Sequence, residues 1–161
     1  FLLPGTHSKL VDVEDGRIVA FRTFMTGEVF AALRGHTILG RMMADTGGAG
    51  PGFARGVAAG AAAPSPGALL SLLFSARTLR LFDEIDAAAA FDYLSGLLIG
   101  AELAEMRGAA GPVVLVGGAD LQERYRTAAS LLAIATIPAP PAVVRAGHLA
   151  IARHAGLVAR A

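Results

Sequence analysis

The chain has 161 residues, which is enough for one ordinary domain with a buried core. Its net charge of +1 gives no reason to expect a nucleic-acid or anionic-membrane partner. Cysteine is absent, which excludes disulfides and thiolate metal sites.

The first 24 residues predict strands. In the stretch 9–14, apolar and acidic side chains alternate from Val11 onward, and residues 18–24 are rich in β-branched and aromatic side chains. Asp15-Gly16 between them suits a type I′ turn, so a β-hairpin is expected. The chain begins at Phe1 with residues typical of a strand end, and we expect it to be a fragment or a processed chain.

The middle of the chain predicts helices. Thr26 is the expected N-cap of a first helix, and residues 44–51 form a glycine-rich loop. A weak helix is expected over 53–63, a linker over 64–67, and a further helix over 69–81. Asp86 is expected to cap a long helix from Ala87 to about Arg107.

Mean hydropathy is +0.56, and two stretches are apolar enough to raise the question of a membrane span. Pro64 and Pro66 interrupt residues 57–76, and Asp92 and Glu102 lie within 87–103. Since a spanning helix needs about 20 continuous, strongly apolar residues, buried helices of a soluble protein are the better interpretation.

The last third predicts an alternation of strands and helices. Residues 113–116 form an aliphatic run typical of a strand buried on both faces. After Gly117-Gly118, Asp120 is expected to cap a helix ending near Ala133, with Glu123 completing a capping box. A strand over 134–137, a turn over 138–141, loop or edge strand over 142–144 and a helix over 147–154 complete the chain. This order predicts an α/β fold, with a mixed sheet packed by helices.

Two glycine-containing turns are candidate binding sites. Gly5-Thr6-His7-Ser8-Lys9 lies between strands, where turn N–H groups, the Thr6 and Ser8 hydroxyls and the Lys9 charge can bind phosphate. Gly117-Gly118 follows a buried strand, where ligands of α/β sheets bind. A plain β-turn and a plain strand-to-helix turn are the alternatives. Neither segment is a Walker A loop.

A metal site made of protein ligands is not expected. The four histidines, His7, His36, His148 and His154, have no partners at metal-binding spacing. His7 alone lies in a candidate site, and His148 and His154 are expected on a helix surface.

Residues 3–9, 23–28 and 93–102, together with 114–118, are similar to the 2-dehydro-3-deoxygalactonokinase family in order and separation, over roughly its C-terminal half. The resemblance implies one lobe of an actin-like, ribonuclease-H-related ATPase fold. It also implies transfer of a phosphoryl group from MgATP to the 6-hydroxyl of 2-dehydro-3-deoxy-D-galactonate, in cytoplasmic galactonate breakdown.

The same resemblance implies roles for particular residues. The turn from Pro4 to Lys9 would face the β- and γ-phosphates of ATP. Gly117-Gly118, with Thr26 and Gly27, would lie near the adenosine. Leu10 stands where the family commonly has Trp, which affects packing rather than the turn's chemistry.

The missing N-terminal lobe would carry the first phosphate loop, the Asp that organises Mg²⁺ and most of the sugar-acid pocket. The catalytic residues, including the base, are therefore unknown, and the isolated chain is expected to be inactive. A homo-oligomer is possible, because an apolar face toward the missing lobe would favour association. A kinase for another sugar acid and a non-catalytic nucleotide-binding or regulatory module are the alternative functions.

Overall fold

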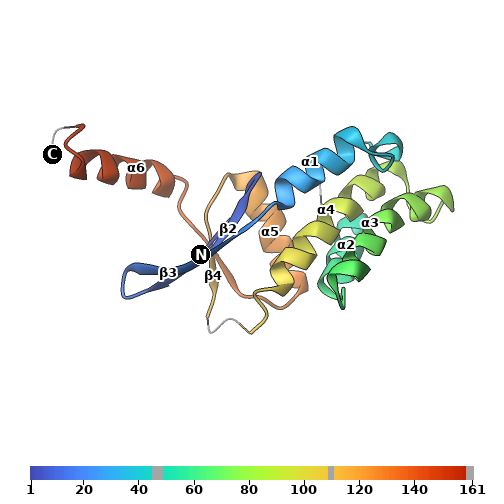
Figure 1. Ribbon diagram of the computed structural model, residues 1–161, viewed down its shortest axis with the longest axis horizontal. Coiled ribbons are helices and arrows are strands. Elements are labelled where there is room, and N and C mark those ends of the chain that lie inside the picture. Colours follow the sequence, from blue (N-terminus) through green and yellow to red (C-terminus); the bar gives the residue numbers. More distant parts are fainter. Residues whose placement is uncertain (45–48, 109–110, 159–161) are drawn as a thin grey trace.

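The computed structural model describes residues 1–44, 49–108 and 111–158. The described chain forms one five-stranded sheet packed by helices, with helices α1 to α4 gathered at one end (Figure 1). The strands are β1 (Leu2–Leu3), β2 (Ser8–Glu14), β3 (Arg17–Phe24), β4 (Val113–Leu115) and β5 (Thr136–Pro138). The helices are α1 (Thr26–His36), α2 (Pro51–Ala61), α3 (Pro66–Leu81), α4 (Ala87–Ala104), α5 (Ala119–Leu131) and α6 (Val143–His154), with a 3₁₀ turn at Gly40–Met42.

The strand order β3-β2-β1-β4-β5 makes the sheet mixed. β2 pairs antiparallel with both β1 and β3, whereas β4 pairs parallel with β1 and β5. The carboxyl ends of β1, β4 and β5 therefore meet at one edge of the sheet. The predicted α/β fold with a mixed sheet is confirmed.

The predicted hairpin is confirmed. Asp15 and Gly16 have φ values of 48° and 73°, as a turn with two positive φ angles requires. The far end of the hairpin extends away from helices α1 to α4 (Figure 1), and nearly all of β3 is exposed, including Ile18 and Phe21 at 68% each.

One face of the sheet packs on α2, α4 and α5. Leu2, Leu10 and Leu115 of the sheet meet Phe53 of α2 and Ile99 of α4 in the larger hydrophobic core. α4 is the one described helix long and apolar enough to cross a membrane, but 72% of that stretch is buried inside the fold. It is thus the central core helix, as its sequence predicts.

Helices α2 and α4 pack closely because glycines face the contact from both sides. Gly52, Gly56 and Gly60 of α2, and Gly96 and Gly100 of α4, are all buried. A Cβ atom on Gly56 would lie less than 3.0 Å from the Tyr93 carbonyl oxygen and from the Leu97 nitrogen. Any side chain here would push apart two rigid backbones.

Two of the three predicted helix caps are wrong. Asp86 does cap α4, since its Oδ1 accepts from the Ala89 N–H at 2.7 Å. Thr26 is instead the first helical residue, after Met25, and its hydroxyl is turned into the core. Asp120 lies inside the first turn of α5 after Gly118, and Glu123 pairs with Arg126.

Two loop predictions also change, and a third is described only in part. Pro66 and Gly67 open α3, with Ser65 accepting from the Ala68 N–H at 3.1 Å, so residues 64–67 are not a plain linker. The predicted loop or edge strand over 142–144 is wrong from Val143 onward, because α6 begins there, just after the Pro140-Pro141 turn. Of the predicted loop 44–51, residues 45–48 lie outside the described residues.

Helix α6 stands apart from the body of the fold (Figure 1). None of its residues is buried, and His148 and His154 are exposed as expected. Val143, Val144, Leu149 and Ile151 are exposed as well. This helix therefore presents apolar side chains that no described element covers.

The α2–α4 contact predicts that Gly56→Ala lowers the free energy of unfolding by about 1–3 kcal/mol or more, because the added methyl group overpacks the interface. Urea unfolding followed by circular dichroism measures this change.

Gly35→Ala is the matched control, since a Cβ on this helical glycine of α1 meets nothing within 4 Å. Alanine favours a helix over glycine by about 1 kcal/mol, so this variant should be unchanged or slightly more stable. Equal stability of the two variants would contradict the close packing.

Candidate functional site

The two turns singled out from the sequence lie side by side at the carboxyl edge of the sheet. The Val116 N–H donates to the Leu2 carbonyl at 2.9 Å, which aligns the ends of β4 and β1. A Cβ atom on Gly117 would lie 3.6 Å from the Pro4 carbonyl oxygen. The β1–β2 turn (residues 4–7) and Gly117-Gly118 are thus neighbours.

The start of α1 reaches the same place. A Cβ atom on Gly27 would lie 2.5 Å from the Gly5 carbonyl oxygen and 2.8 Å from Thr6 Cα, so only glycine fits here. The Glu28 N–H donates to the Thr6 carbonyl at 2.9 Å. We call Gly5, Gly27, Gly117 and Gly118 the glycine edge, because they bring three separate segments together.

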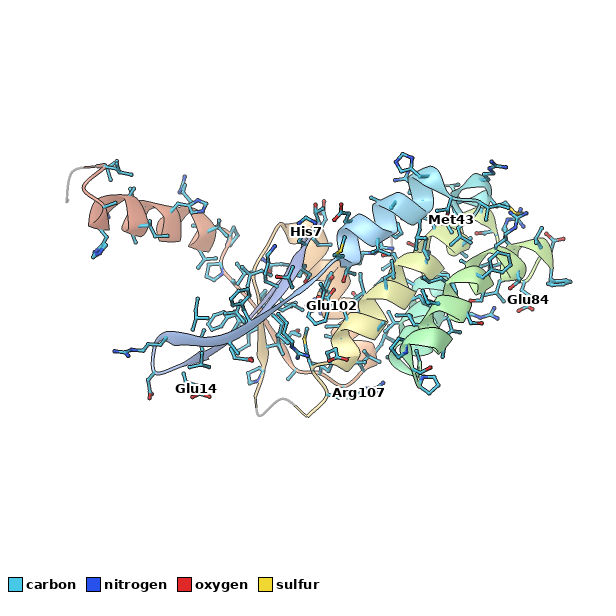
Figure 2. The ribbon with its side chains drawn as sticks, in the orientation of Figure 1. His7, Glu14, Met43, Glu84, Glu102 and Arg107 are labelled. Carbon is cyan, nitrogen blue, oxygen red and sulfur yellow. The ribbon has the colours of Figure 1, made fainter. Side chains whose placement is uncertain are left out.

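Side chains also fix the β1–β2 turn. His7 Nε2 lies 2.6 Å from Glu28 Oε2, with both side chains about half exposed, and Lys9 Nζ donates to the His7 carbonyl at 2.7 Å. His7 lies near the start of α1 in Figure 2. The exposed His7–Glu28 pair contributes little stability, but together the two contacts hold the His7 imidazole and the Lys9 ammonium group at the turn.

Directly behind the turn lies a buried carboxyl group that the sequence interpretation missed. Glu102 of α4 is 3% exposed and lies between the sheet and the helices (Figure 2). It accepts from Ser8 Oγ at 2.5 Å, from Thr26 Oγ1 at 2.5 Å and from the Tyr125 hydroxyl at 2.7 Å. Glu102, Ser8, Thr26 and Tyr125 form what we call the Glu102 network.

The sequence predicted that the Ser8 hydroxyl can bind phosphate, but in the structure this hydroxyl donates to Glu102 instead. Ser8 is 0% exposed, and as the first residue of β2 it alternates with Lys9 so that its side chain faces the core. Its proton is directed at Glu102. Ser8 anchors the turn from behind, while Thr6, His7 and Lys9 lie toward its outer side.

Tyr125 remains a hydrogen-bond donor. Burial, and then the negative charge of Glu102 and the hydrogen bond to it, raise the pKa of Tyr125 above its ordinary value of 10.0. The phenol therefore keeps its proton throughout the neutral range.

A cavity of about 210 Å³ opens beside the glycine edge. Gly5, Thr26 and Gly27 form one wall, and Phe30, Phe91 and Arg124 lie among the others. The rings of Phe30 and Phe91 meet edge to face at 5.2 Å. The cavity is mostly apolar, with a single guanidinium group among its described lining residues.

Contacts on several sides hold that guanidinium. Arg124 donates to Asp92 Oδ1 at 2.7 Å and to Ser95 Oγ at 2.9 Å, and it lies 4.7 Å from the centre of the Phe53 ring. Asp92 is itself buried and also accepts from the Gly50 N–H at 3.1 Å. These contacts fix one wall of the cavity.

A second hollow, of about 490 Å³, lies beside Gly117 and Gly118. Ala119, Gln122 and residues 138–141 complete its lining. Gln122 Nε2 donates to the Gly117 carbonyl at 2.8 Å, which fixes the turn. The glycine edge is thus flanked by two recesses with largely apolar walls.

No metal-binding cluster is visible in residues 1–44, 49–108 and 111–158, where no group of three or more His, Cys, Asp or Glu side chains is placed to hold an ion. Of the two carboxyl groups beside the turn, Glu28 faces His7 and Glu102 faces three hydroxyls. The described residues around the turn therefore do not fit a resident magnesium site.

A family model described as 2-keto-3-deoxy-galactonokinase matches residues 1–151. A Rhizobium meliloti (strain 1021) protein provisionally named 2-dehydro-3-deoxygalactonokinase DgoK1 is 42% identical over 94% of this chain and 51% of its own length. The 2-dehydro-3-deoxygalactonokinase of Escherichia coli K12 is 34% identical over 80% of this chain and 44% of its own length.

A crystal structure of a Sinorhizobium meliloti protein, provisionally described as a 2-dehydro-3-deoxygalactonokinase, has the same fold. It matches 95% of this chain and 52% of its own, with a TM-score of 0.83 and 37% sequence identity. The chain spans about half the length of the relatives it matches. The mixed sheet packed by helices is as expected of an actin-like ATPase lobe.

The Tyr125–Glu102 contact predicts how stability changes at alkaline pH. The folded chain keeps the Tyr125 proton above pH 10.0, where an unfolded tyrosine loses it. The unfolded state then binds fewer protons, so the free energy of unfolding falls as pH rises, by up to about 1.4 kcal/mol per pH unit.

Tyr125→Phe removes this contribution, so its free energy of unfolding should fall less steeply between about pH 9 and 11 in urea titrations. Tyr93→Phe removes the only other tyrosine of the chain, whose hydroxyl meets Ser75 at 2.7 Å, and should keep the wild-type decline. Identical pH profiles for the two variants would contradict the buried hydrogen bond between Tyr125 and Glu102.

Proposed function

We propose that this chain, which belongs to the 2-keto-3-deoxy-galactonokinase family, supplies the ATP-binding half of a cytoplasmic sugar-acid kinase. The whole enzyme would phosphorylate the 6-hydroxyl of 2-dehydro-3-deoxy-D-galactonate in galactonate breakdown. The names of the two curated relatives support this reaction. A kinase of the same superfamily for another sugar acid would share the ATP-binding half and differ in the substrate pocket.

The observation that carries the proposal is the convergence of three segments at the glycine edge. Ligands of α/β sheets bind beyond the carboxyl ends of the strands, where β1 and β4 end here. An added Cβ atom would meet nothing within 4 Å at Gly5 or Gly118, so a ligand can approach the backbone closely there, whereas Gly27 lets the start of α1 reach the turn. Lys9 and His7 lie beside the same turn and can offset negative charge.

In this proposal the β1–β2 turn binds the β- and γ-phosphates of ATP. Backbone N–H groups of Gly5, Thr6 and His7, the Thr6 hydroxyl and the Lys9 ammonium group would contact phosphate oxygens. Ser8 would hold the turn in place through Glu102. Fixed donors of this kind stabilise the charge that spreads over the transferred phosphoryl group.

The adenosine would lie across the other half of the glycine edge. Gly117 and Gly118 would leave the backbone open to a flat ring, and Thr26 and Gly27 would form the facing wall. The two apolar recesses on either side suit a purine base better than they suit a charged group.

Mg²⁺ and the catalytic base would come from elsewhere. The carboxyl groups beside the turn are engaged with His7 and with hydroxyls, so the ion would be held by the nucleotide and by a second, N-terminal lobe. The chain spans about half of its relatives, and exposed apolar side chains on β3 and α6 offer surfaces for such a lobe. These surfaces can also pair copies of the isolated chain.

The proposed phosphate contact predicts that the 161-residue chain binds MgATP and that Lys9→Met weakens binding about ten-fold, the loss of one charge-assisted contact. Isothermal titration calorimetry measures both affinities. Arg17→Met, a charge removed at the far end of the hairpin, is the matched control and should bind as the wild type does. Equal loss in both variants would exclude a specific contact.

A second expectation concerns turnover. Phosphoryl transfer needs groups positioned on both sides of the nucleotide, so the isolated chain should bind MgATP without phosphorylating 2-dehydro-3-deoxy-D-galactonate. A coupled assay for ADP, with the full-length protein as positive control, measures this. Multiple turnovers by the chain alone would contradict the two-lobe proposal. Binding without turnover in the full-length protein would favour the non-catalytic, nucleotide-binding alternative.

A further inference from the structure

The Glu102 network joins parts of the chain that are distant in sequence. Glu102 lies in α4, and its three donors come from β2, α1 and α5, at separations of 94, 76 and 23 residues. A carboxyl group removed from water is costly unless hydrogen bonds satisfy it, and removing one partner leaves a buried polar group unmatched. The position of each donor element is therefore tied to the same two oxygen atoms.

One of these donors borders the β1–β2 turn, and a second precedes the residue of α1 that packs against this turn. Ser8 is the residue directly after the turn, and Thr26 is the residue directly before Gly27. Gly27 touches Gly5, and the Glu28 N–H donates to the Thr6 carbonyl. With Ser8 and Thr26 both held by Glu102, the turn and the start of α1 are clamped together at their base.

The third donor extends the network to the other half of the glycine edge. Tyr125 lies in α5, the helix that begins directly after Gly117-Gly118. Its neighbour Arg124 lines the cavity beside Gly5 and Gly27. One carboxyl group thus sets the position of every segment that contributes to the glycine edge.

We propose that Glu102 is a positioning residue for the nucleotide: it fixes the geometry of the glycine edge from behind without touching the ligand. It does so by accepting hydrogen bonds from three hydroxyl groups. The effect of Glu102 on nucleotide binding rests on the proposed function. The effect of Glu102 on the position of the β1–β2 turn is a property of the chain alone.

Glu102→Gln is the discriminating variant. The amide keeps the size of the side chain but replaces one acceptor oxygen with an N–H₂ group, which cannot accept a hydroxyl proton. At least one donor then loses its acceptor. Glu105→Gln is the matched control, three residues further along the chain, where the carboxyl group is about half exposed and pairs with Arg22 at 2.8 Å.

The first measurement is amide hydrogen exchange of the full 161-residue chain without nucleotide. In Glu102→Gln, the amides of Ser8 and Lys9 in β2 and of Glu28, whose N–H donates to the Thr6 carbonyl, should exchange at least about ten-fold faster, a local loss of protection, while amides of α2 keep the wild-type rate. Glu105→Gln should match the wild type throughout. Unchanged exchange at the turn, or an equal rise in α2, would overturn the inference, because a merely structural role loosens the whole fold.

The second measurement is MgATP affinity by calorimetry. Glu102→Gln should bind about ten-fold more weakly than the wild type and Glu105→Gln equally well. Unaltered affinity in Glu102→Gln would overturn the claim that Glu102 positions the glycine edge for the nucleotide. A wild-type chain that binds no MgATP overturns the proposed function instead, and the exchange pattern still decides whether Glu102 clamps the turn.

Thr26→Val covers the case in which Glu102→Gln does not fold. Valine keeps the shape of threonine and removes a single donor, so the other two hydrogen bonds to Glu102 remain. The same faster exchange should appear at the amides of Ser8, Lys9 and Glu28, to a smaller extent. Protection equal to the wild type in a folded Thr26→Val chain would overturn the inference.

Discussion

The structure depends on one buried carboxyl group and on the hydroxyls that surround it. Glu102 lies in the most buried helix of the fold, where an unpaired polar group would be strongly destabilising. Its partners Ser8, Thr26 and Tyr125 belong to three other elements, so satisfying the carboxyl group also fixes those elements in space. The β1–β2 turn, the start of α1 and the start of α5 are therefore parts of one arrangement.

Close backbone contacts complete this arrangement. The glycines of α2 and α4 let these helices approach until a Cβ atom would clash, which seats α4 firmly against the rest of the core. Gly27 does the same between α1 and the β1–β2 turn. Since both contacts exclude a side chain, they leave little freedom for the segments that carry Gly5, Gly117 and Gly118. A ligand at the glycine edge would meet a surface that is already formed, which lowers the cost of binding.

Local patterns predicted much of the fold. Asp15-Gly16 predicted the hairpin, Asp86 the start of α4 and residues 113–116 a core strand, because turn geometry, capping and hydrophobic runs are local properties. The same patterns failed at Thr26 and Asp120. At Thr26 a tertiary contact decided the outcome, because its hydroxyl donates to a carboxyl group 76 residues away.

The candidate site was less predictable than the fold. Glu102 is an acidic residue in an apolar helix, which is a signal of a buried polar group, but no local pattern identifies its hydrogen-bond partners. The two glycine-containing turns could be singled out from local sequence, but their proximity to each other and to Gly27 follows from the strand order, so only the family resemblance grouped all three segments.

The most direct test of the account is an amide ¹H–¹⁵N spectrum of the chain titrated with Mg²⁺ and a non-hydrolysable ATP analogue. Gly5, Thr6, Gly27, Gly117 and Gly118 should shift together along one binding curve, while Gly147 of α6 and Gly16 of the hairpin turn stay in place. That result would establish the glycine edge as a nucleotide site. Shifts confined to other regions, or none at concentrations well above those of cellular ATP, would contradict it.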